Sequence, residues 1–170
     1  MCYNNTMKIL VIGDTHGKLN MVRDIMSKLK GIDLIMHTGD HYRDGTALEE
    51  EYHIPVVAVR GNCDAGGGEA FRVIETEAGK ILLTHGHKLG VDYDLTRLVY
   101  KAQEEECVAA VYGHTHVPLV DEIDGLRIIN PGSLPRSRDG SGGSYAVIRT
   151  EEDRLDASVI YYNTVMGVLP

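Results

Sequence analysis

The segment Lys8-Ile9-Leu10-Val11-Ile12-Gly13-Asp14-Thr15-His16 joins a short apolar run to a polar loop. The run up to Ile12 is rich in β-forming residues and predicts a strand, and Gly13 marks its end. In an extended loop, the alternate residues Asp14 and His16 can point to the same side. The segment therefore predicts a strand that delivers a carboxylate and an imidazole to a functional loop.

The same arrangement occurs four more times along the chain. In each case an apolar run ends at a small or polar loop that carries an Asp, Asn or His. Open α/β sheets place their ligands at the carboxyl ends of the strands, so these side chains are candidates for one site. The predicted strands 34–36, 55–59, 81–83 and 108–111 lead to Gly39-Asp40, Gly61-Asn62, His85-Gly86 and Gly113-His114.

Two helices are predicted between these strands. Apolar residues recur at helical spacing from Leu19 to Leu29, and a second helix is expected from Asp94 to Glu106. Consecutive glutamates at 104–106 point in different directions on a helix, which favours a solvated face over a metal site. After His116, short β segments at 119–123, 126–129, 145–149 and 155–162 predict a closing β meander.

The expected fold is of the α/β class and forms one domain over residues 1–170, with residues 1–6 as a loose leader. We predict a four-layer sandwich, in which two mixed β-sheets pack face to face with helices outside. The segment Arg136 to Gly143 is rich in Arg, Ser and Gly. It predicts a mobile loop, which is either a linker or a flap that faces the substrate.

Composition excludes several classes of protein. With 43% hydrophobic and 25% charged residues in 170, the chain can bury a core without disulfides. The cysteines Cys2, Cys63 and Cys107 form no CxxC pair, which favours a reducing compartment and counts against a zinc clip. The apolar runs are too short to cross a bilayer and no signal-peptide pattern is present, so a cytoplasmic protein is expected.

Seven polar side chains at the strand ends are candidate metal ligands. Hydrolysis of a phosphate ester requires an activated water, neutralised phosphoryl oxygens and help for the leaving alkoxide, and two divalent metals supply the first two. A structural zinc site usually has four ligands, commonly with cysteines, so seven candidates favour the two-metal hypothesis. The candidates are Asp14, His16, Asp40, Asn62, His85, His114 and His116.

In these blocks the chain resembles the calcineurin-like metallophosphoesterases, whose signature reads GDxH, GD, GNHD or a variant, H followed by glycine, and GHTH. The match spans positions 8 to about 135 in the family's order. It is most similar to small bacterial and archaeal members, predicted phosphodiesterases that also carry GNCD and Asn-Pro-Gly-Ser, here Asn130 to Ser133. The five blocks are Gly13–His16, Gly39-Asp40, Gly61–Asp64, His85–His87 and Gly113–His116.

The resemblance implies a centre of two divalent ions. It assigns Asp14, His16 and His116 to one ion, Asn62, His85 and His114 to the other, and Asp40 as the bridge. A hydroxide that bridges the ions would attack phosphorus in line with the departing alkoxide, without a covalent intermediate. The family favours Mn²⁺, although nitrogen and oxygen ligands also suit Ni²⁺, Zn²⁺, Fe²⁺ and Co²⁺.

The chain departs from the family at the expected acid for the leaving group. Cys63 stands where many larger members have a histidine, and a thiol matches that role poorly. His87 and Asp64 are therefore further candidates, as proton donors or as partners of the ligands. A structural role for His87 and a small buried hydrophobe at Cys63 remain open. The family's acidic-then-arginine pair is reversed in Arg43-Asp44, which counts against a phosphate clamp at Arg43.

Other polar residues near the motifs are explained by structural or surface roles. His37 and His53 are expected to be surface residues or satisfied inside the fold. His41 has either a supporting or a surface role. Arg136 and Arg138 follow the Asn-Pro-Gly-Ser segment and could contact the substrate, but at least one of them is expected in solvent.

The expected function is hydrolysis of a small phosphodiester, with a monoester as a close variant. A net charge of -8 counts against extended nucleic acid, while bound cations would still make the site locally positive. The alternative is a catalytically weak metal-binding scaffold, a role that one eukaryotic relative of this fold has, and the complete ligand set disfavours it. No membrane partner is expected. A homodimer is predicted through an exposed strand of the C-terminal meander.

Overall fold

The first apolar run forms a strand that is buried on both faces. Of its residues, Ile9 and Val11 contact one cluster of buried side chains, and Leu10 and Ile12 contact another. Successive side chains of a strand point to opposite faces, so a run without polar residues needs a covering layer on each side. This strand therefore lies in the interior of the fold.

The computed structural model describes residues 6–167, so the expected leader lies outside it except for the exposed Thr6. The strands are β1 (Met7–Ile12), β2 (Leu34–His37), β3 (Val56–Ala58), β4 (Phe71–Thr76), β5 (Gly79–Thr84), β6 (Cys107–Val111), β7 (Leu119–Ile123), β8 (Leu126–Asn130), β9 (Ser144–Glu151) and β10 (Arg154–Tyr161). The helices are α1 (Asn20–Lys28), α2 (Arg43–Tyr52), the 3-10 helix η1 (His87–Leu89), α3 (Thr96–Glu104) and α4 (Tyr162–Met166).

The strands form two sheets, each with parallel and antiparallel pairs. The first has the order β10-β9-β1-β2-β3, in which β1, β2 and β3 are parallel. The second has the order β4-β5-β6-β8-β7, in which β5, β6 and β8 are parallel. The remaining pairs are antiparallel. The prediction of two mixed sheets is confirmed.

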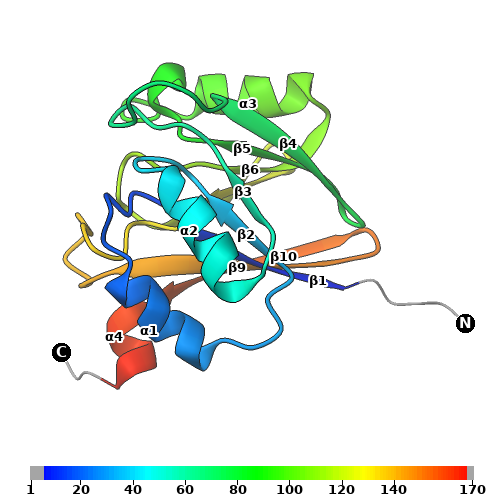
Figure 1. The fold of residues 1–170 in the computed structure, drawn as a ribbon. Helices are drawn as coiled ribbons and strands as arrows, with labels where there is room; N and C mark the ends of the chain where they lie inside the picture. Colours follow the sequence, from blue (N-terminus) through cyan, green and yellow to red (C-terminus); the bar gives the residue numbers. More distant parts are fainter. Residues whose placement is uncertain (1–5, 168–170) are drawn as a thin grey trace, which may run out of the picture.

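Three buried clusters separate four layers of structure. The central cluster joins Ile9 of β1 to Ile81 of β5 and so lies between the sheets. A second cluster packs α1 and α2 on the outer face of the first sheet, and a third packs α3 on the outer face of the second. Figure 1 shows α3 above the second sheet, α1 and α4 at the bottom of the molecule, and α2 in front of the strands of the first sheet. The predicted sandwich of two sheets between helices is therefore confirmed.

The predicted β meander after His116 is wrong. β7 and β8 form a hairpin on the second sheet, whereas β9 and β10 form a hairpin on the first. The last predicted strand also ends one residue early, because Tyr162 begins α4. Turn signals identify hairpins, but the sheet that each hairpin joins depends on contacts with distant strands.

Several elements have no clear signal in the sequence. α2 contains Gly45 and only a few apolar residues, of which Leu48 is buried. β4 is an edge strand whose side chains are all exposed or partly exposed. Elements that bury little apolar surface give weak periodicity. The chain has no helix within residues 6–167 that is long and apolar enough to span a membrane.

A buried polar network ties the loop after β1 to the start of α2. His37 Nδ1 accepts a hydrogen bond from Gly39 N (3.1 Å), so its Nε2–H can donate to Thr15 Oγ1 (2.9 Å). The Thr15 hydroxyl then donates to Asp44 Oδ2 (2.6 Å), which also accepts from Gly17 N (3.0 Å). The sequence did not predict this network. Asp44 of the reversed pair is a buried anchor of two loops, while Arg43 is exposed.

His37 is held neutral inside this network. The ring is fully buried, and burial lowers its pKa from 6.5 to about 4, against the opposing charge of Asp44. The satisfied-histidine interpretation therefore holds for His37. His53, by contrast, is an exposed residue at the end of α2.

This burial predicts a loss of stability in acid. Between about pH 7 and about pH 5 the unfolded His37 takes up a proton that the folded ring refuses, so the free energy of unfolding should fall by about 2 kcal/mol on this account. Urea unfolding of His37→Gln at the two pH values should show a smaller fall than the wild type. His53→Gln is the control and should keep the wild-type slope. Equal pH dependence in all three proteins would contradict the assignment.

Candidate metal centre

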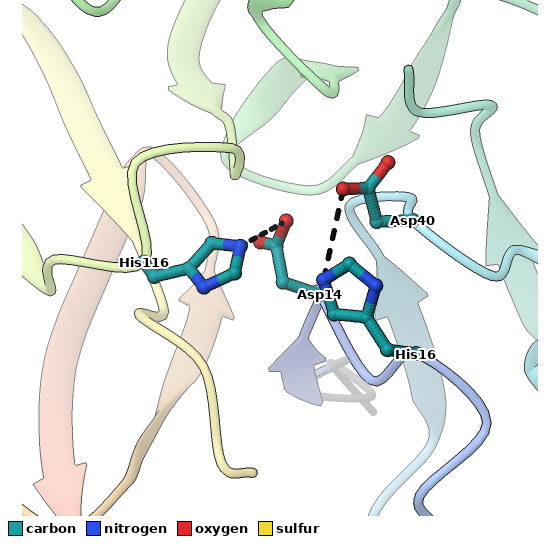
Figure 2. A group of neighbouring side chains, drawn as sticks. All are labelled: Asp14, His16, Asp40 and His116. Carbon is teal, nitrogen blue, oxygen red and sulfur yellow. Dashed lines mark ion pairs between the residues drawn. The ribbon is translucent and has the colours of Figure 1, made fainter. Parts of the chain in front are cut away.

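Four of the predicted ligands come together at one edge of the sandwich. The ligand atoms of Asp14, His16, Asp40 and His116 all lie within 4.8 Å of one another. His116 Nε2 is 3.2 Å from Asp14 Oδ1, and His16 Nε2 is 3.7 Å from Asp40 Oδ2 (Figure 2). The residues follow β1, β2 and β6, so two sheets contribute to the group. The cluster is a possible metal-binding site.

The donor atoms in this cluster fit a cation. Asp14 is fully buried, and its Oδ1 has no well-formed hydrogen bond to residues 6–167. The buried His16 Nε2 likewise lacks such a partner among the described residues. Buried polar atoms without partners are costly, and a carboxylate beside imidazole nitrogens is an established donor set for divalent metals. A bound ion would satisfy both atoms.

The backbone is strained at each of these four ligands. Asp14, His16, Asp40 and His116 have φ values of 51°, 48°, 54° and 59°, in the left-handed region. Residues other than glycine rarely adopt this backbone conformation, and each instance costs about 1–3 kcal/mol. Such strain persists where surrounding contacts over-determine the conformation. Its concentration here supports a functional role for the cluster.

Glycines before the ligands allow the loops to pack against one another. A Cβ at Gly39 would lie 2.8 Å from Gly61 N and 2.9 Å from His85 Nδ1, and the φ of Gly39 is 107°. A Cβ at Gly61 would collide with the Asp40 carboxylate. These positions therefore accept only glycine, which explains the Gly-Asp and Gly-Asn pairs in the sequence.

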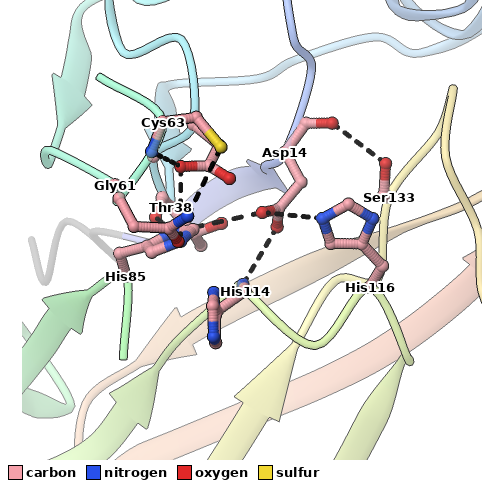
Figure 3. A network of polar contacts seen from close by, with 12 residues as sticks. Asp14, Thr38, Gly61, Cys63, His85, His114, His116 and Ser133 are labelled. Atoms are coloured by element: carbon pink, nitrogen blue, oxygen red, sulfur yellow. Dashed lines mark hydrogen bonds and ion pairs between the residues drawn. The ribbon is translucent and has the colours of Figure 1, made fainter. Parts of the chain in front are cut away.

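The other three predicted ligands are Asn62, His85 and His114, and they adjoin the cluster at Asp40. His85 Nε2 is 3.0 Å from Asn62 Oδ1 and 3.4 Å from Asp40 Oδ1. The ring of His114 is 5.0 Å from the ring of His85, edge to face, but its Nε2 binds Asp92 Oδ2 at 2.6 Å. Figure 3 shows His85 and His114 next to Asp14 in one polar network. All seven predicted residues are therefore neighbours, and His114 has an additional partner that the sequence did not indicate.

Two of the histidines are oriented by backbone carbonyls. His85 Nδ1 donates to Thr38 O (2.8 Å), and His116 Nδ1 donates to Arg136 O (2.8 Å). In each ring, Nε2 is then the atom that faces the carboxylates. His116 lies so close to Asp14 that this contact raises its pKa, and burial opposes the shift. His116 therefore keeps its proton to a higher pH than a free histidine does.

Burial has different effects on the pKa values of Asp40 and His16. Burial raises the pKa of the Asp40 carboxyl, but the hydrogen bond from Cys63 N and the charge of His85 outweigh it and hold this pKa below its usual value. Burial lowers the pKa of His16, and the charge of Arg136 lowers it further. At neutral pH, Asp40 is therefore ionised and His16 is neutral, as metal ligands must be.

Asp64 supports the loops around the site. Its carboxylate accepts hydrogen bonds from three backbone amides, those of His41 (2.7 Å), Tyr42 (3.0 Å) and Gly61 (2.8 Å). Oδ1 accepts from the first two amides and Oδ2 from the third, so both oxygens serve as acceptors for the loops. This arrangement favours the partner role for Asp64 over a proton donor.

Cys63 is exposed, so the interpretation as a small buried hydrophobe is wrong. Partial desolvation and the neighbouring Asp40 raise the pKa of the thiol. Its Sγ accepts a hydrogen bond from Asn62 Nδ2 (3.4 Å). In the absence of metal, the side chain is thus a protonated thiol near the cluster.

His87 is close to the ligands, with its ring 5.1 Å from His85 and 6.1 Å from His114. Its buried Nδ1 has no hydrogen-bond partner within the described part of the chain. Burial lowers its pKa, and His85 and His114 lower it further. His41 is exposed, and its Nδ1 is 2.7 Å from Asp44 Oδ1, which gives it a supporting contact from the surface.

The Asn-Pro-Gly-Ser segment supports the cluster through hydrogen bonds to the ligand loops. Ser133 Oγ donates to Asp14 O (3.0 Å), and Arg136 N donates to Ser133 Oγ (3.1 Å). Asn130 Nδ2 donates to Gly113 O (3.1 Å), at the start of the block that carries His114. Arg136 and Arg138 are both exposed. The sequence motif was noticed, but these contacts were not predicted.

The loop expected to be mobile contains its own polar contacts. Asp139 accepts hydrogen bonds from the side chains of Ser137 and Ser141, and Asn163 Nδ2 donates to Ser141 O (3.2 Å). These bonds connect the loop to α4.

Known proteins are similar to this chain in sequence and in fold. The model of the calcineurin-like phosphoesterase superfamily domain matches residues 7–153. The probable metallophosphoesterase YsnB of Bacillus subtilis (strain 168) is 33% identical over 161 residues, which cover 92% of this chain and 91% of the relative. Phosphodiesterase YfcE of Escherichia coli K12 is 27% identical over 167 residues, which cover 84% and 87%.

A solved structure agrees with this relationship. The crystal structure of a conserved protein from Streptococcus pneumoniae TIGR4, a predicted phosphoesterase, matches with a TM-score of 0.79 and 28% identity, and the match covers 95% of this chain and 92% of the other. The two-sheet fold, the possible metal-binding cluster and these sequence matches lead to one conclusion. The chain belongs to the calcineurin-like phosphoesterase superfamily.

Proposed function

We propose that this protein is a two-metal phosphodiesterase. The position of Asp40 carries the proposal. Its Oδ2 lies 3.7 Å from His16 Nε2, and its Oδ1 lies 3.4 Å from His85 Nε2. One carboxylate thus faces a histidine from each predicted ligand set. A carboxylate placed between the two sets could contact both ions of a two-metal site.

In the proposed centre, Asp14, His16 and His116 hold one ion, Asn62, His85 and His114 hold the other, and Asp40 contacts both. Divalent ions held by these residues would supply an activated water and would neutralise the phosphoryl oxygens. The protein's own contribution is orientation. Loops tied by Asp64 and Ser133 hold the ligands in strained conformations before a substrate arrives, which avoids reorganisation during the reaction.

The native metal stays a proposal based on the family resemblance, which favours Mn²⁺. The proposed ligands are nitrogen and oxygen atoms only, so they also suit Ni²⁺, Zn²⁺, Fe²⁺ or Co²⁺. Cys63 Sγ accepts a hydrogen bond from Asn62 Nδ2, and we assign the thiol no role as a metal ligand.

Departure of the leaving group receives little help from acids in the described part of the chain. His87 has a lowered pKa and is neutral at neutral pH, and nearby cations would lower this pKa further. The pKa of Cys63 is raised, so it is a poor acid. The carboxylate oxygens of Asp64 are used as acceptors for three backbone amides. We propose that the enzyme prefers esters of acidic alcohols, and that His87 binds a phosphoryl oxygen through its single N–H.

The proposed substrate is a small phosphodiester. The relative YfcE is named a phosphodiesterase, which favours a diester over a monoester here. All seven candidate ligands are retained as neighbours, which favours catalysis over a metal-binding scaffold. Location in the cytoplasm and a homodimer remain predictions. For the dimer, the eight-residue edge strand β10 (Arg154–Tyr161) is the available pairing surface.

Metal-dependent hydrolysis is the direct test. Metal-stripped protein should hydrolyse a chromogenic aryl phosphodiester faster than its monoester once Mn²⁺ is added back, and Ni²⁺, Zn²⁺ and Mg²⁺ should be compared singly. Asp40→Ala should reduce kcat by roughly 10³-fold or more, because the side chain that contacts both ions is removed. His53→Gln, at an exposed histidine outside the site, should retain full activity. Absence of turnover with every metal would overturn the proposal and favour the scaffold.

Metal binding should release a proton near neutral pH. Because the folded pKa of His116 is raised, this ring remains protonated to higher pH than a free histidine, and a metal ion must displace the proton. Affinity should therefore fall as pH decreases through the range in which His116 is protonated. Calorimetry in two buffers of different ionisation enthalpy measures the released protons. His116→Gln should release fewer, and an equal number in both proteins would contradict the assignment.

The rate should depend steeply on the leaving group. With a series of aryl methyl phosphodiesters, log kcat should decrease strongly as the pKa of the phenol rises, because no acid protonates it. Cys63→Ser should change the rates only modestly and should leave this slope unchanged. If instead Cys63→Ser selectively loses activity on esters of weakly acidic phenols, Cys63 is the proton donor.

A further inference from the structure

His114 differs from the other oriented histidines of the centre in its hydrogen-bond partner. Its Nε2 lies 2.6 Å from Asp92 Oδ2, in the segment between η1 and α3. His85 and His116 donate instead to backbone carbonyls. A carbonyl oxygen can only accept, so it always selects the ring tautomer that donates to it. For His114, the group that can select the tautomer is a side-chain carboxylate, that of Asp92.

The surroundings of His114 define which ring atom is left for a metal. Its backbone N donates to Asp14 Oδ2 (3.1 Å), and its ring packs edge to face against His85 at 5.0 Å. With Nε2–H directed at Asp92, a neutral ring has its lone pair on Nδ1. Nδ1 has no hydrogen-bond partner among residues 6–167, so it is the free donor atom of this ring.

We propose that Asp92 is a positioning residue, whose carboxylate selects the Nε2–H tautomer of His114 and leaves Nδ1 free to hold the second ion. The metal part of this inference rests on the proposed function. A carboxylate that accepts from a ligating histidine also makes the ring a better donor, and loss of such partners typically weakens metal binding by about 10–100-fold.

The same segment provides a matched control. Asp94 lies two residues further along, and its Oδ1 accepts a hydrogen bond from Thr96 N (2.8 Å) at the start of α3. It has no contact with the centre. Asp92→Asn and Asp94→Asn thus make the same isosteric change in one loop, but only the first alters the partner of His114. An asparagine at 92 can also donate an N–H to Nε2, which would favour the opposite tautomer.

The first test reads the tautomer without metal or substrate. Long-range ¹H–¹⁵N NMR spectra of the metal-free protein at mildly alkaline pH distinguish a histidine protonated on Nε2 from one protonated on Nδ1, and His114→Gln assigns the signal. The wild type and Asp94→Asn should show His114 with Nε2–H. Asp92→Asn should shift it towards Nδ1–H, while His85 and His116 keep their signals and so report an intact fold. A wild-type His114 protonated on Nδ1, or a signal that Asp92→Asn leaves unchanged, would overturn the proposal.

The second test reads the metal. In Mn²⁺ titrations followed by calorimetry and by electron paramagnetic resonance, Asp92→Asn should weaken one of two ions about 10–100-fold and leave the other near its wild-type affinity. Asp92→Glu, which keeps a carboxylate, should recover part of the loss. Two ions with unchanged affinity in Asp92→Asn would refute the role. Neither readout uses hydrolysis, so an inactive wild type would count against the proposed function and not against Asp92.

Discussion

The buried carboxylate of Asp14 connects the two halves of the fold. Its backbone lies at the end of the first sheet, where Asp14 N donates to Gly39 O (3.0 Å). Its Oδ2 accepts from His114 N in the second sheet's loop, and its backbone oxygen accepts from Ser133 Oγ. Asp14 is fully buried, so its remaining oxygen needs a positive partner, which His116 provides with a proton or a metal ion provides instead. The site and the packing of the sheets at this edge therefore depend on the same charge.

This requirement explains why the centre is built from strained loops. Short connections must direct several donor atoms to one point, and ordinary backbone conformations would aim some of them elsewhere. The chain accepts positive φ angles at Asp14, His16, Asp40 and His116, at a total cost of several kcal/mol. Packing of the clusters on both faces of β1 offsets that cost. The favourable free energy of core packing thus allows the four side chains to keep a fixed arrangement at the edge.

Hydrogen bonds from outside the ligand set maintain this arrangement. Asp64 holds three backbone amides, and Asp44 holds Thr15 and Gly17. Asp92 belongs to the same class, but it acts on a ligand's ring and not on a loop's backbone. Carboxylates therefore have three distinct placements around this cluster: some face imidazole nitrogens inside it, some anchor loops, and Asp92 contacts a histidine ring from outside. Part of the net charge of -8 is used inside the protein and not displayed to solvent.

The amino-acid sequence by itself indicated every described strand except β4, the order of the five blocks and the seven candidate ligands. These are local properties, because an apolar run, a glycine and a polar residue are adjacent in the chain. Only the tertiary structure decided which sheet each C-terminal hairpin joins and which residues support the ligands. Asp14 and Ser133 are 119 positions apart, and Asp92 is 22 positions from His114. Such contacts leave no periodic signal, because they arise only where packing brings two loops together.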